Sequence, residues 1–212
     1  MKDLVILVAD KNMEYTVRGL LGRPQALEIQ PVEWDLFVHP RRDPGCLNEA
    51  HDFLRPFSHD YRFAMVLFDH HGSGQERRPA AELVARVQLN LARNGWADQA
   101  RVVVLGPELE AWVWSDSPSV DGCLGWAGHR PPLREWLSAN GHWPDGATKP
   151  PDPKGAMEAA LRHTRKPRSS AIYLDLASRV GLRGCTDPAF RCFVHTLQEW
   201  FPRRPDAAGN EI

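Results

Sequence analysis

Acidic side chains follow three apolar runs of the sequence, as in sites that bind a divalent cation. Asp10 comes after residues 4–8, Asp69 after residues 62–68, and Glu108 just beyond residues 101–105. Carboxylate oxygens are the ligands that Mg²⁺ and Mn²⁺ prefer, and such sites support phosphoryl transfer. The residues that we take as candidate metal ligands are Asp10, Glu14, Asp69, His71, Glu108 and Glu110.

The same acids have an ordinary structural interpretation. Asp10 is a plausible N-cap for a helix, and Glu108 could begin a short helix over residues 108–114, where a negative charge favours the positive end of the helix dipole. For any one of these carboxylates taken alone, the structural role is the more common one. The sequence leaves both roles open.

Two adjacent histidines follow Asp69. On an extended strand end they point in opposite directions, so Asp69 and His71 share a side while His70 faces away. An Asp-x-His pair suits Mn²⁺, Zn²⁺ or Fe²⁺, and we take Asp69, His71 and Glu108 as the catalytic candidates. The next residues, Gly-Ser-Gly at 72–74, could cradle an anion with their amides, although a histidine beside glycine can also be a simple loop residue.

Apolar patterning predicts the elements that position these side chains. Residues 4–8, 62–68 and 101–105 are continuous apolar strands, and residues 26–38 are expected to be extended. Helices are expected over residues 11–21, 46–57 and 79–94. This alternation predicts an α/β fold with three layers and a mostly parallel central sheet, whose sites lie at the carboxyl ends of the strands.

The second half of the chain has a different composition. Beyond residue 116 it is rich in Gly, Pro, Trp and Ser, with helices expected over residues 133–139, 153–164, 169–180 and 188–201 and a polar tail over residues 203–212. We therefore expect an α/β core over residues 1–116, and a loop-rich, helical extension over residues 117–212 that packs on the same core.

Composition limits the class of protein. The chain has 212 residues, with 26 basic and 27 acidic side chains, so no global charge favours nucleic acid or membrane as the default partner. The first apolar run is too short for a signal peptide or a membrane span, and the 4 cysteines have no zinc-site spacing. A cytoplasmic protein with reduced thiols is expected, with no membrane partner.

Three segments together resemble a TOPRIM-like bacterial family of unknown function. They are residues 8–14 (VADKNME), residues 67–72 (LFDHHG) and residues 107–116 (PELEAWVWSD), of which the last is the most specific. The later segments at residues 153–154 (PK) and 176–185 (LASRVGLRGC), with Phe190 and Phe193, are also similar, so that the resemblance covers most of the chain.

This resemblance implies a TOPRIM-like three-layer domain with a helical C-terminal extension. In the wider group, a first acid and an Asp-x-Asp pair hold Mg²⁺ for DNA cleavage or nucleotidyl transfer. Asp10 stands where a glutamate is expected, and His71 replaces the second aspartate. The implied site is therefore either one with an altered metal preference or a degenerate, non-catalytic one.

The resemblance also implies a biological setting. Relatives of this kind are encoded beside ATPases in bacterial defence neighbourhoods, which implies a component of an antiviral defence system with protein partners. A second, weaker similarity is to DHH-type phosphoesterases, whose Asp-His-His segment looks like residues 66–71 (VLFDHH). The upstream aspartate-rich motif of those enzymes is absent here.

Two functions follow for this sequence. The first is a metal-dependent nuclease or phosphoesterase, with His71 as ligand or general acid/base and with nucleic acid as a substrate. The second is a non-enzymatic sensor or adaptor that docks an ATPase, because aromatic residues are enriched at interface anchors. The tryptophans considered for docking, which could equally be core residues, are Trp112, Trp114, Trp126, Trp136 and Trp143. The basic residues that could meet phosphates, or simply form a solvated helix end, are Arg162, His163, Arg165, Lys166 and Arg168.

Overall fold

Four parallel strands form the centre of the molecule, in the order β2-β1-β3-β4. The computed structural model describes residues 1–115 and 117–203. The strands are β1 (Lys2–Val8), β2 (Trp34–Val38), β3 (Tyr61–Asp69) and β4 (Ala100–Leu105). Residues 4–8 and 64–68 are fully buried, because helices cover both faces of the sheet.

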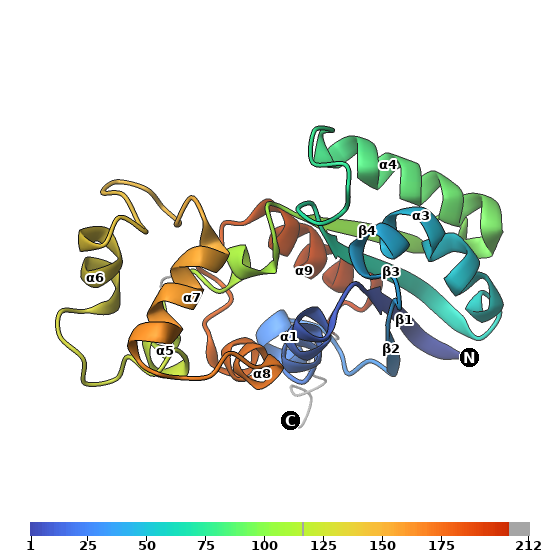
Figure 1. Cartoon of the computed structure of the whole chain (residues 1–212). Helices are drawn as coiled ribbons and strands as arrows, with labels where there is room; N and C mark the ends of the chain where they lie inside the picture. The colour runs from blue at the N-terminus through green and yellow to red at the C-terminus, as the bar shows by residue number, and fades with distance from the viewer. Residues whose placement is uncertain (116, 204–212) are drawn as a thin grey trace, which may run out of the picture.

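Helices alternate with the strands and form two outer layers (Figure 1). The elements of this half are α1 (Lys11–Leu21), α2 (Pro24–Leu27), α3 (Arg42–Leu54), η1 (Arg55–Phe57), α4 (Ala80–Leu91) and η2 (Ala92–Trp96). Helices α3 and α4 pack against each other and against β3 and β4 on one face, while α1 lies on the other. The chain is thus an α/β protein with an all-parallel sheet between helical layers, as its sequence predicts.

The second half of the chain leaves the sheet and returns to it. Its elements are η3 (Leu109–Trp112), α5 (Ser119–Cys123), α6 (Leu133–Ala139), α7 (Pro153–His163), α8 (Ser170–Arg179) and α9 (Pro188–Trp200). Helices α5, α6 and α7 extend to one side, whereas α8 packs along α1 and α9 packs on β4 (Figure 1). The stacked rings of Phe63 and Trp200, with centroids 4.4 Å apart, fasten the end of α9 to β3. Residue 116, at the expected domain boundary, and residues 204–212 of the polar tail lie outside the described residues.

The helix predicted over residues 11–21 is α1, and Asp10 caps it. The Met13 amide donates a hydrogen bond of 2.9 Å to Asp10 Oδ1, which satisfies one of the free amides of the first turn. In the part of the chain that the structure describes, no helix is long and apolar enough to cross a membrane.

The prediction was less accurate between β1 and β3. Only residues 34–38 of the segment expected to be extended form a strand, and the following helix begins at Arg42 rather than at residue 46. Strand β2 is short, lies at the edge of the sheet and is only half-buried. The sequence predicted extended structure here but did not identify a strand end at Val38, so a fourth carboxyl end was not considered.

Candidate functional site

The carboxyl ends of β1 and β3 lie side by side, at the point where the order of the strands reverses. The chain passes from β1 to β2 on one side, whereas β3 and β4 lie on the other. In open α/β sheets, ligands bind in the crevice at such a point. Asp10 follows β1 and Asp69 ends β3, so the topology places both carboxylates at this edge.

Asp69 is the half-buried centre of the candidate site. Its Oδ1 atom is shielded from solvent and has no hydrogen-bond partner in the described part of the chain. Burial raises the pKa of Asp69 well above its usual value, and the negative charges of four neighbouring carboxylates raise it further. In order of effect, these neighbours are Asp43, Glu110, Asp10 and Glu108.

Asp43 is the neighbour with the largest effect, and the sequence did not predict it. It lies in the first turn of α3, after β2, and its Oδ1 accepts a hydrogen bond of 2.8 Å from the Asp69 amide. Burial raises the pKa of Asp43, although hydrogen bonds from two backbone amides oppose the shift. The signal for this residue was present, because an acid follows an extended segment at the start of a helix here just as Asp10 does.

Glu108 lies at the more open side of the cluster. Burial and the charge of Glu110 raise its pKa, while the positive charges of Lys154 and His71 oppose that shift. Lys154 Nζ is 3.8 Å from Glu108 Oε2. The His71 amide donates a hydrogen bond of 2.9 Å to the Pro107 carbonyl, which holds the loop after β3 against the loop after β4. The structure thus brings His71 into the electrostatic reach of Glu108.

Glu110 is bound by partners from the second half of the chain. Its Oε1 accepts hydrogen bonds from Tyr173 Oη at 2.5 Å and from Arg168 Nη2 at 2.6 Å. Arg168 also pairs with Glu158 at 2.5 Å. Glu110 therefore adds negative charge to the cluster, but one of its two oxygens is already engaged. Glu14 is engaged as well, since its Oε1 lies 2.9 Å from Arg18.

The two histidines do not diverge as they would on a strand. Strand β3 ends at Asp69, so both lie in a turn, and their rings stack with centroids 6.3 Å apart. His70 Nε2 is 2.8 Å from the Arg78 carbonyl oxygen, which directs this ring toward the loop. His71 is the histidine that acts on Glu108.

The glycine turn after the histidines does hold an anion, and that anion is a side chain of the protein. The amides of Gly72 and Gly74 donate hydrogen bonds of 2.9 and 3.1 Å to Glu76 Oε1. Both glycines have positive φ, which allows the turn to close around the carboxylate. Hydrogen bonds from the backbone amides of Glu76 itself, Gly74 and Gly72 lower the pKa of Glu76, and they leave the turn with its anion site filled.

The carboxylates interact by charge without forming a ready-made ligand shell. Within residues 1–115 and 117–203, no group of three or more Asp, Glu, His or Cys side chains is already arranged to hold a metal ion. Asp10 Oδ1 is used by the helix cap, whereas Asp69 Oδ1 is unpartnered. The donor set fits a hard cation that takes oxygen ligands, provided that the side chains adjust on binding.

No family model matches this sequence, and no curated protein or solved structure matches it either. What the site can do therefore follows from its own residues. A carboxylate with one shielded, unpartnered oxygen among other acids can bind a cation or can hold a proton at neutral pH.

The tryptophans considered as docking anchors are packing residues for the most part. Trp112, Trp114, Trp126 and Trp143 are buried. Each of these four donates its indole N–H to an oxygen of the same chain, at 2.9 to 3.1 Å. Trp136 is half-buried and packs on Trp126, with ring centroids 5.1 Å apart. Satisfied, buried indoles leave little aromatic surface for a partner.

Several residues of the basic run also have internal partners. Lys166 donates a hydrogen bond of 2.7 Å to the Cys123 carbonyl, and Arg162 lies 3.8 Å from Glu158. His163 stacks on Trp126 with centroids 4.9 Å apart. Together with the contacts of Arg168 to Glu110, these interactions hold the end of α7 and the segment after it in place.

Proposed function

We propose that this protein is a TOPRIM-like, metal-dependent phosphodiester hydrolase with its site at the carboxyl edge between β1 and β3. The observation that carries the proposal is the buried, unpartnered Oδ1 of Asp69, surrounded by the charges of Asp10, Asp43, Glu108 and Glu110. Several negative charges around one buried oxygen are unfavourable alone and become favourable around a divalent cation.

The roles follow from the position of each side chain. Asp10, Asp43 and Asp69 would hold Mg²⁺ or Mn²⁺, with Glu108 at the open side. The bound cation would supply Lewis acidity and neutralise charge that develops on the phosphate. His71, beside Glu108, is the group that moves a proton, and Lys154 offers a positive charge to a phosphate oxygen at the same edge.

The positions of the acids along the chain support the TOPRIM-like assignment. An acid follows the first strand, an Asp-x-His pair follows the third, and the segment at residues 107–116 follows the fourth. The missing second aspartate of the pattern is the main argument for a degenerate site. Asp43 weakens that argument, because it supplies another carboxylate beside Asp69 from a different element.

Metal binding is the first test. We expect Mn²⁺ or Mg²⁺ to bind the full chain in isothermal titration calorimetry and to raise its melting temperature. Asp69→Asn should weaken binding at least about tenfold, because it removes a charged ligand. Asp98→Asn is the matched control, since Asp98 is exposed and precedes β4 at the opposite edge of the sheet. Equal metal affinity in the wild type and Asp69→Asn would overturn the proposed site.

Cleavage is the second test. We expect Mn²⁺-stimulated nicking of plasmid DNA or cleavage of RNA by the wild type and by Asp98→Asn, and loss of that activity in Asp69→Asn and Asp69→Ala. Cleavage that persists in the Asp69 variants would belong to a contaminant.

We further propose, on the resemblance of residues 107–116, that the protein acts in antiviral defence together with an ATPase. In the native host, deletion of its gene should increase phage plating. Complementation with Asp69→Asn separates the two functions considered for the chain: failure to restore protection supports the hydrolase, and full protection supports a non-enzymatic adaptor.

A further inference from the structure

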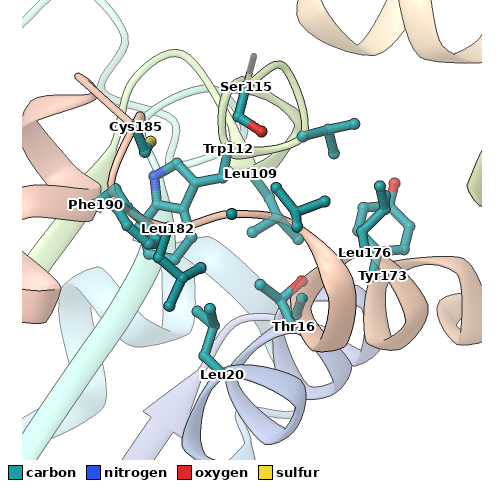
Figure 2. A pocket seen from close by; sticks show the side chains of 14 residues that line it. Thr16, Leu20, Leu109, Trp112, Ser115, Tyr173, Leu176, Leu182, Cys185 and Phe190 are labelled. Atoms are coloured by element: carbon teal, nitrogen blue, oxygen red, sulfur yellow. The ribbon is translucent and has the colours of Figure 1, made fainter. Parts of the chain in front are cut away.

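An apolar cavity of this protein lies between α1, η3, α8 and the loop over residues 181–185. A molecule the size of water has about 40 Å³ of free space within it, and the mouth of the cavity opens to solvent. Figure 2 shows the rings of Trp112 and Tyr173 on opposite sides of this cavity, with Leu109 between them and with Leu182 and Leu20 below. The lining is almost entirely carbon, as in sites that bind small apolar molecules.

The polar ends of the lining residues point away from the cavity or are already satisfied. Trp112 Nε1 donates to Asp187 at 3.1 Å, and Tyr173 Oη donates to Glu110 at 2.5 Å. Thr16 Oγ1 donates to the Asn12 carbonyl at 2.9 Å. Burial raises the pKa of the Cys185 thiol, which keeps it neutral. These side chains offer a ligand an apolar surface only.

Ser115 is the exception among the lining residues. Its Oγ is shielded from solvent and has no hydrogen-bond partner in the described part of the chain. Figure 2 shows this hydroxyl at the rim of the cavity. A buried hydroxyl without a partner costs stability, and a ligand that pairs with it recovers that cost.

We propose that this cavity is a binding site for a small, single-ring aromatic molecule that carries one hydrogen-bonding group. The rings of Trp112, Tyr173 and Phe190 and the aliphatic side chains around them accept the apolar ring. Ser115 Oγ pairs with the single polar group. The site is separate from the acidic cluster, although Tyr173 borders both through its ring and its hydroxyl.

Phenol and toluene are matched probes, because they have nearly the same shape and differ in the hydroxyl group. In isothermal titration calorimetry with the full chain, we expect one phenol molecule to bind per chain. Phenol should bind roughly two- to tenfold more tightly than toluene, which is the worth of one hydrogen bond.

Two substitutions at Ser115 test the assignment. Ser115→Ala keeps the cavity and removes the hydroxyl, so the preference for phenol over toluene should disappear. Ser115→Leu adds bulk at the rim and should weaken both probes. Ser119→Ala is the control, because Ser119 does not line the cavity, and it should bind as the wild type does.

Absence of saturable binding of either probe to the wild type would overturn the proposal. Unchanged binding in Ser115→Leu would place the ligand elsewhere and would also overturn it. Equal affinities of phenol and toluene for the wild type would refute the role of Ser115. Because these readouts need neither a metal nor cleavage, their failure is distinguishable from failure of the hydrolase proposal.

Discussion

At the scale of single residues, Asp69 combines burial, crowding by like charges and an unpartnered oxygen. Its backbone amide is satisfied by Asp43, so the fold holds the main chain in place while the side chain remains unfavourable when ionised. Such a combination is typical of a group that awaits a cation or keeps a proton. A cation-bound Asp69 and a protonated Asp69 would affect the stability of the fold differently when the pH or the metal concentration changes.

The pH dependence of stability reports the burial of Asp69. Because its pKa is higher in the folded than in the unfolded chain, the fold binds this proton more tightly, and stability is lost as pH rises above the unfolded value near 3.8. Asp69→Asn should therefore be more stable than the wild type at pH 7 without metal. The gain should be about 1.4 kcal/mol for each pKa unit of the shift, and it should vanish toward pH 4.

Urea unfolding from pH 4 to pH 8 in the presence of a chelator measures this difference. Asp98→Asn controls for the loss of one charge from the molecule. A difference between Asp69→Asn and the wild type that does not change with pH would contradict the assigned environment.

At the scale of elements, the carboxyl end of each strand leads into a helix or turn, and the first residues of these helices and turns lie at the carboxyl edge of the sheet. Asp10 illustrates two roles of one side chain, because it caps α1 and also contributes to the field at Asp69. A cap needs an oxygen acceptor, whereas a cation ligand needs a charge.

Two substitutions of Asp10 separate those roles. Asp10→Asn keeps an N-cap acceptor, so its free energy of unfolding should stay near that of the wild type while its Mn²⁺ affinity falls. Asp10→Ala should lose about 1 kcal/mol of stability as well as affinity. Chemical denaturation and calorimetry measure both quantities, and wild-type Mn²⁺ affinity in Asp10→Asn would limit this residue to capping.

The contact between α8 and η3 depends on a buried hydrogen bond. Tyr173→Phe keeps the ring and removes the hydroxyl that donates to Glu110, so Glu110 keeps only Arg168 at that oxygen. We expect a loss of about 1–3 kcal/mol in the free energy of unfolding, because a buried acceptor loses a partner. Tyr15→Phe is a control, since Tyr15 is only half-buried. If Tyr173→Phe and Tyr15→Phe lose the same free energy of unfolding, the hydrogen bond from Tyr173 to Glu110 does not contribute to stability.

At the scale of the whole molecule, the second half of the chain packs on the first through α8, which lies along α1, and through α9, which lies on β4. Gly19 permits this approach, because a Cβ atom at this position would lie 2.7 Å from the Cβ of Ala177 and 3.0 Å from the Leu174 carbonyl oxygen. The close approach of α8 also places Tyr173 beside Glu110.

Gly19→Ala should therefore lower the stability of the whole chain. Alanine favours a helix by about 1 kcal/mol, but the overlap with α8 should cost more, for a net loss of roughly 1–2 kcal/mol. Adding Ala177→Gly should restore part of the loss. Gly122→Ala, at a helical position with open space around it, is the control that should be neutral or stabilising. A more stable Gly19→Ala would contradict the close contact.

The sequence by itself determined the strand-helix alternation, the parallel sheet, helix α1 with its Asp10 cap, and acids at three strand ends. These features are encoded locally, in continuous apolar runs and in the residue types that begin and end helices. The edge strand β2 was predicted only as part of a longer extended segment, so its end was not located and Asp43 was missed.

Only the tertiary structure decided which side chains meet. Glu110 accepts hydrogen bonds from Arg168 and Tyr173, which lie 58 and 63 residues later in the chain. Asp69 contacts Asp43 because the order of the strands brings their two segments together. The cavity beside Ser115 is formed by α1, η3 and α8, which are distant in sequence. Such contacts depend on how elements pack, and the local pattern of one chain segment does not contain that information.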